Sequence, residues 1–127
     1  MHPDAEVRLP SETAYVAVLR MAASGIAARL DFTLDEIEDL RMAVSEACSL
    51  VLTDATPGGS MTARFYLDRQ HIEVRVSADA VEPSVPDTDS FAWQVLTTTA
   101  TDVTAAAGPD ELAVTLTIAA TSTRDPA

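Results

Sequence analysis

The spacing of apolar residues changes near residue 60 of this chain, and that change constrains the fold more than any other feature. Between Tyr15 and Val51, apolar residues recur every three or four positions, as on the buried face of a helix. From Met61 to Val76 they alternate with polar residues, as in strands with one wet face. We therefore expect two helices followed by a β-hairpin, within a single domain of 127 residues.

The two expected helices have recognisable starts. Ser11 is placed to cap the first helix, whose buried face should include Leu19. Thr33 stands three residues before Glu36, which is the capping-box pattern for a second helix. That second helix should run to about Asp54, because a turn containing proline and two glycines follows.

The remaining segments complete a sheet and a layer of helices. Extended segments are expected at 5–10 and 112–118, a proline-containing loop at 80–89, and frayed ends at about 1–4 and 121–127. A third helix is expected over 90–103, with Phe91 and Val95 on its buried side. Helices on one face of a mostly antiparallel mixed sheet make an α/β (α+β) two-layer sandwich.

The charge of the chain narrows the classes of partner. Twenty acidic residues oppose eight basic ones, lysine is absent, and the net charge is −12. This charge repels phosphate backbones, so we expect no direct binding of nucleic acid, whereas basic proteins would be attracted. No apolar run reaches the roughly 18 residues that span a bilayer and the start does not read as a signal peptide, which predicts a cytoplasmic protein without a membrane partner.

A family resemblance rests on the second helix. The segment LRMAVSEACSLVL at 40–52, preceded by LDFTLDEIED at 30–39, resembles the anti-sigma factors of the RsbW and SpoIIAB type. These belong to the superfamily that includes gyrase and the histidine kinases, and the resemblance extends over about residues 6–120. It implies a Bergerat-type ATP-binding fold and a homodimer that sequesters an RNA polymerase sigma factor until an anti-anti-sigma factor displaces it. Typical members also phosphorylate a serine of that antagonist.

The resemblance locates an ATP site, and this chain departs from the family pattern there. Glu46 matches the catalytic glutamate base, but Leu50 replaces the magnesium-binding asparagine, and a hydrocarbon cannot coordinate Mg²⁺. Ala78 and Ala80 replace the aspartate that reads adenine and its accompanying glycine, and Ala92 replaces a glycine of the phosphate loop. We therefore expect no ATP, magnesium or other cofactor, and Glu46 to be at most a vestigial base.

Other candidate sites are few. His2 and His71 do not have the spacing of metal ligands, so no metal site is expected. Cys48 lies at helical spacing among apolar residues, which favours a buried structural thiol. Arg20 has no acidic residue three or four positions away, and in the resembling family an arginine at this matching position contacts the partner. Arg20 is therefore the candidate partner-binding residue, although a solvated or internally paired arginine is the alternative.

Three functions remain open from the sequence. The leading hypothesis is an anti-sigma factor that acts by binding alone. The second is an active serine/threonine kinase with a nonstandard MgATP site, in which Glu46 is the base and Asp54 or Asp79 supplies an oxygen. The third is a scaffold whose partner is not a sigma factor.

Overall fold

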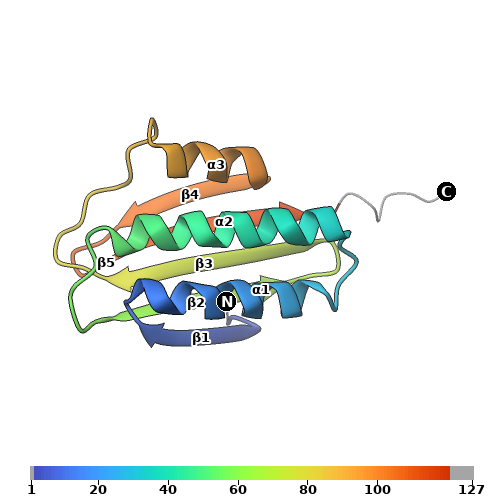
Figure 1. The fold of residues 1–127 in the computed structure, drawn as a ribbon, viewed down its shortest axis with the longest axis horizontal. Coiled ribbons are helices and arrows are strands. Elements are labelled where there is room, and N and C mark those ends of the chain that lie inside the picture. Colours follow the sequence, from blue (N-terminus) through green and yellow to red (C-terminus); the bar gives the residue numbers. More distant parts are fainter. Residues whose placement is uncertain (1, 121–127) are drawn as a thin grey trace.

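A computed structural model describes residues 2–120 of the chain. Three helices lie side by side over one face of a five-stranded sheet, and no helix of the described residues covers the other face (Figure 1). The expected two-layer sandwich is confirmed. None of the described helices is both long and apolar enough to cross a membrane.

The sheet has the order β1-β2-β3-β5-β4, and each of its four pairings is antiparallel. The strands are β1 (Ala5–Pro10), β2 (Ser60–Leu67), β3 (His71–Asp79), β4 (Asp102–Ala107) and β5 (Glu111–Ala119). The helices are α1 (Val16–Ala27), α2 (Leu34–Leu52) and α3 (Phe91–Thr99), and a 3-10 turn, η1 (Thr13–Tyr15), precedes α1. The sheet is thus more regular than the mixed sheet expected, with no parallel pairing among the described strands.

The second helix begins as the sequence predicts. The Thr33 hydroxyl accepts a hydrogen bond from the backbone N–H of Glu36 at 3.1 Å, and the Glu36 carboxylate accepts one from the N–H of Thr33 at 2.8 Å. This capping box satisfies two N–H groups at the helix start. The fully buried face of α2, which faces the sheet, contains Ala43, Val44, Ala47, Cys48 and Val51.

The first helix begins later than predicted, and Ser11 does not cap it. The Ser11 hydroxyl is buried without a hydrogen-bond partner, while its backbone N–H donates to the carbonyl of Gly59 at 3.0 Å. The chain turns immediately after β1 through a bond from the N–H of Glu12 to the carbonyl of Pro10. Since that turn and η1 occupy 11–15, regular α1 starts only at Val16.

The third helix is shorter than predicted, and its buried face was misassigned. It ends at Thr99, and the chain enters β4 at Asp102, where the sequence pattern suggested that the helix continues. Leu96 is fully buried, whereas Phe91 is 81% exposed. The helix ends early because the backbone becomes extended at Ala100 and the following residues pair with β5 as strand β4.

The amino-terminal end is anchored at Asp4. Its backbone N–H donates to the carbonyl of Phe65, and its carboxylate accepts a hydrogen bond from the N–H of Leu67, both at 2.8 Å. Met1 and residues 121–127, for which fraying was also predicted, lie outside the described residues.

Candidate functional site

The predicted magnesium position borders a small pocket between the end of α2 and the loop before α3. Leu50 is half-buried there, one helical turn after Glu46, which does not line the pocket. The pocket has a volume of about 280 Å³ and is lined by Leu50, Thr53, Asp54, Ser84, Val85, Pro86, Asp87, Ser90 and Leu112. Pockets that hold drug-sized ligands occupy roughly 300–1,000 Å³, so this pocket lies just below that range.

The lining of the pocket combines apolar and acidic side chains. Leu50, Val85 and Leu112 supply apolar side chains, and Asp54 and Asp87 supply carboxylates. Two carboxylates repel the bare phosphates of a triphosphate, whereas carboxylate oxygens are ligands that Mg²⁺ accepts. Among residues 2–120, no group of three histidine, cysteine, aspartate or glutamate side chains is arranged to hold a metal ion.

The positions that would read adenine are occupied by buried methyl groups. Ala78 lies on the helix-facing side of β3 and Ala80 just beyond its end, paired through a bridge with Ala55. Neither side chain can accept a hydrogen bond from an adenine amino group. Asp79 projects from the opposite face of the sheet, where its carboxylate accepts the N–H of Ser60 at 2.8 Å. The alternative in which Asp79 supplies an oxygen to this pocket therefore conflicts with the structure.

The start of α3 is capped by the chain itself. Ser90 is the N-cap, and its hydroxyl accepts the backbone N–H of Trp93 at 3.2 Å. Ala92 lies half-buried in the first turn, and the preceding loop contains Pro83 and Pro86, which have no N–H to offer. Backbone donors for a phosphate are thus reduced where the family pattern has a glycine-rich loop.

The four positions at which this chain departs from the family pattern lie near the same pocket. Of these residues, Leu50, Ala78, Ala80 and Ala92, only Leu50 lines it. Leu112 is the cross-strand partner of Ala78 and lines the pocket, and so does Ser90, two residues before Ala92. The location of a nucleotide site here stays a prediction. No local pattern in the sequence indicates that the loop at 80–90 lies close to Leu50.

Arg20 belongs to α1 and is half-buried, and its side chain reaches toward α2. Its Nη1 donates a hydrogen bond to the Ser45 hydroxyl at 3.2 Å, and its carbonyl accepts one from the Ser24 hydroxyl. No ion pair to Arg20 is formed within residues 2–120. The Ser45 contact was missed in the sequence, because helical spacing does not show which residues of two helices face each other.

Cys48 is fully buried on α2. Burial raises the pKa of its thiol from 9.0 to about 12, and the positive charge of Arg20 opposes that shift. The thiol is therefore protonated at neutral pH, and the prediction of a buried Cys48 is confirmed.

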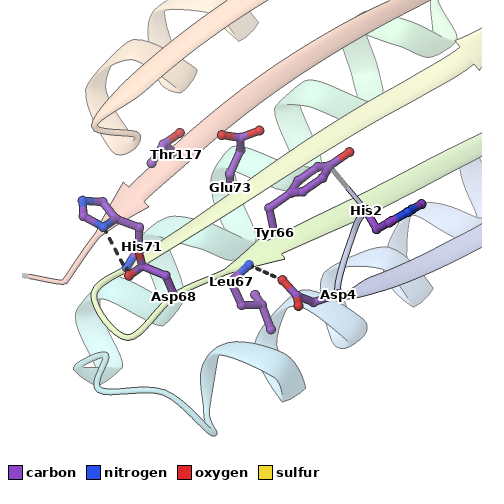
Figure 2. Close-up of a pocket in the computed structure, with 8 residues that line it drawn as sticks. All are labelled: His2, Asp4, Tyr66, Leu67, Asp68, His71, Glu73 and Thr117. Atoms are coloured by element: carbon purple, nitrogen blue, oxygen red, sulfur yellow. Dashed lines mark hydrogen bonds and ion pairs between the residues drawn. The ribbon is translucent and has the colours of Figure 1, made fainter.

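A second pocket, of about 490 Å³, lies at the turn between β2 and β3 (Figure 2). It is lined by His2, Asp4, Tyr66, Leu67, Asp68, His71, Glu73 and Thr117. The Asp68 carboxylate accepts hydrogen bonds from the backbone N–H groups of Gln70 and His71, and chiefly the Gln70 bond lowers the Asp68 pKa. Two of the pocket's carboxylates, those of Asp4 and Asp68, thus hold the backbone of the hairpin.

Comparison with known proteins assigns the chain to a family. A model of the histidine kinase-like ATPase domain matches residues 9–118. The chain belongs to this family.

Individual relatives point to one branch of the family. The chain is 41% identical over 73 residues to the serine-protein kinase RsbW of Halalkalibacterium halodurans, which covers 57% of this chain and 45% of the relative. It is 39% identical over 75 residues to the RsbW of Bacillus subtilis, covering 57% and 47% respectively. The RsbW of Listeria innocua is 39% identical over 80 residues, covering 61% and 51%. The chain spans about half the length of these relatives.

Proposed function

We propose that this protein is an anti-sigma factor that binds an RNA polymerase sigma factor and yields it to an anti-anti-sigma antagonist. The similarity to RsbW proteins supports the class of protein. The observation that carries the mode of action is Leu50, which borders a pocket of about 280 Å³ where the resembling proteins need an oxygen ligand for magnesium. In this mode of action the protein acts by binding the sigma factor, and it requires neither ATP nor another cofactor.

The charge of the molecule supports a basic protein partner. A net charge of −12 accelerates encounter with a positively charged surface and opposes contact with nucleic acid itself. A sigma factor must present basic surface to DNA, so it fits this requirement. In this proposal the protein is a cytoplasmic homodimer.

Arg20 is the residue that we propose to contact the partner. Its guanidinium is held by a neutral hydroxyl, that of Ser45, rather than by a carboxylate. Several of its five N–H donors are thus free to meet a carboxylate of another protein, for which the planar guanidinium is suited.

An active kinase is the less favoured function. Asp79 lies on the opposite face of the sheet from the helices, which leaves Asp54 as the proposed source of an oxygen ligand near Leu50. A scaffold with a different partner remains the other alternative, and it differs only in what it binds.

Affinity capture followed by calorimetry tests the proposal. The purified protein is used to capture partners from the source organism, and each captured protein is then titrated in purified form. We expect a sigma factor to bind with a stoichiometry of one sigma factor per monomer or per dimer, without nucleotide. Capture of no sigma factor, or capture only in the presence of MgATP, would contradict the proposal.

A further inference from the structure

The face of the sheet that no described helix covers carries a group of arginines (Figure 1). Arg8 on β1, Arg64 on β2 and Arg75 on β3 alternate with residues that pack into the core, so their side chains stand on the uncovered face. They are three of the eight basic residues in a chain whose net charge is −12. Basic side chains are therefore concentrated at one place on an acidic molecule.

The strand register gathers these arginines around a pair of hydroxyl groups. Thr62 on β2 is the cross-strand partner of Arg8 on one side and of Ser77 on the other. Arg64 lies two residues after Thr62, and Arg75 lies two residues before Ser77, so all of them share one face. Arg64 and Arg75 are cross-strand partners of each other. We call these five side chains the arginine cluster.

The two hydroxyl groups of the arginine cluster have no hydrogen-bond partner. Thr62 is 8% exposed and Ser77 is 4% exposed, although no helix of the described residues covers this face. The stems of long arginine side chains can cover neighbouring surface in this way. Within residues 2–120, neither hydroxyl makes a hydrogen bond. Polar side chains that are this deeply buried normally have a partner, so these two hydroxyls point to a ligand.

The positive charge of the arginine cluster is only partly compensated. The Nε of Arg64 donates to the Glu6 carboxylate at 3.2 Å, and the Nη2 of Arg75 donates to the Glu111 carboxylate at 2.7 Å. Arg8 forms no ion pair within the described part of the chain. Like charges directly opposite each other on neighbouring strands are destabilising. A bound anion would reduce the cost of placing Arg64 opposite Arg75.

We propose that the arginine cluster binds a single phosphate group. The three guanidinium groups supply charged N–H donors, which suit the oxygens of a phosphate. The hydroxyls of Thr62 and Ser77 lie between them and supply two O–H donors, which the phosphate oxygens would satisfy. The ligand is one phosphate group and not a nucleic acid, because the other charges of this acidic molecule repel a longer polyanion.

This site is separate from the surface that we assign to the sigma factor. Arg20 belongs to α1, on the helical side of the sheet, whereas the arginine cluster lies on the other side. The inference therefore goes beyond the proposed function and does not depend on which protein is the partner.

Nuclear magnetic resonance titration of the isotope-labelled full chain tests the site. Inorganic phosphate is added to millimolar concentrations, with sodium chloride adjusted to hold the ionic strength constant. We expect saturable shifts of the backbone amide signals of Thr62, Arg64 and Ser77, because these amides lie beside the bound anion. Saturable shifts confined to other parts of the chain would overturn the inference.

Two further ligands distinguish the source of the phosphate group. They are O-phosphoserine and the peptide Gly-Ala-phosphoserine-Ala-Gly, whose unphosphorylated form is the control. Tighter binding of the phosphopeptide than of inorganic phosphate assigns the site to a phosphorylated protein, and equal or weaker binding assigns it to the free ion. Absence of saturable shifts with all three phosphate ligands, or equal binding of the unphosphorylated peptide, would contradict the proposal.

Removal of one guanidinium group tests the charged part of the site. Arg8→Gln should keep the fold, because Arg8 is exposed, and should weaken phosphate binding at least about tenfold, as expected for loss of a charged hydrogen bond. Arg69→Gln is the matched control, since Arg69 is exposed in the β2–β3 turn outside the arginine cluster. Equal affinities of the two variants would overturn the inference.

Removal of the hydroxyls tests the neutral part of the site. The double variant Thr62→Val, Ser77→Ala should also bind phosphate at least about tenfold more weakly than the wild-type protein. Thr104→Val is the control, because Thr104 is an exposed threonine of β4 outside the arginine cluster. The amide spectra show whether each variant is folded, and the Arg8→Gln result decides the matter if the double variant is not. A folded double variant with wild-type affinity would exclude the two hydroxyls from the site and contradict the proposal.

Discussion

At the scale of single residues, Arg20 carries the clearest prediction for partner binding. Arg20→Glu should leave the fold intact, since Arg20 makes one side-chain hydrogen bond, to Ser45. It should weaken binding of the sigma factor by about 2 to 4 kcal/mol, as for an arginine at the centre of an interface. Arg69→Glu, at an exposed position in the β2–β3 turn, is the matched control for charge reversal. Calorimetry in which both variants bind like the wild-type protein would remove Arg20 from the interface.

Leu50 carries the prediction about catalysis. Leu50→Asn restores the amide that the resembling proteins use for magnesium, but Ala78, Ala80 and Ala92 still leave the nucleotide without its anchors. We therefore expect no phosphate transfer to a cognate antagonist by this variant in a radiolabelled ATP assay. Transfer by the single variant would show that one side chain separates this protein from an active kinase.

Cys48 links pH to stability. Because burial raises its pKa in the folded chain from 9.0 to about 12, the folded state holds the thiol proton more tightly than the unfolded state. Its contribution to stability is complete below pH 9.0 and declines as the pH rises toward 12. Urea unfolding between pH 8 and pH 11 should show this decline in the wild-type protein and a smaller one in Cys48→Ala. Equal slopes for the two proteins would refute the assignment.

At the scale of elements, removing the hydroxyl of Thr33 and removing that of Ser11 should have different effects on the free energy of unfolding. Thr33→Ala removes the capping box of α2 and should lower the free energy of unfolding by about 1 kcal/mol. Ser11→Ala should be neutral or stabilising, because the Ser11 hydroxyl is buried without a partner. Chemical denaturation of both variants measures this difference. A larger loss for Ser11→Ala than for Thr33→Ala would contradict the structure.

The elements also show which parts of the fold the sequence can predict. The boundaries of α2 and of the β2–β3 hairpin follow from local signals, namely a capping box and a change of period. The end of α3 does not, because threonine-rich sequence permits either a helix or a strand and only pairing of β4 with β5 decides between them. Contacts between elements were equally inaccessible, which is why the Arg20 bond to Ser45 was missed.

At the scale of the whole molecule, the sequence predicts the candidate site as a set of missing ligands but does not predict the shape of the pocket there. The positions of Leu50, Ala78, Ala80 and Ala92 came from matching a family motif along the chain. The small volume of the pocket depends on the approach of the 80–90 loop to the end of α2, which is a tertiary contact. The absence of tight nucleotide binding therefore stays a prediction, which rests on the residues at these four positions.

The central claim is that this domain binds its sigma factor without using ATP. A calorimetric titration of the purified protein with its captured sigma factor, performed in EDTA and repeated with millimolar MgATP, tests that claim most directly. We predict binding in EDTA and the same dissociation constant with MgATP, since a ligand that does not bind cannot shift the equilibrium. Binding that requires MgATP, or tightens tenfold in its presence, would contradict the account.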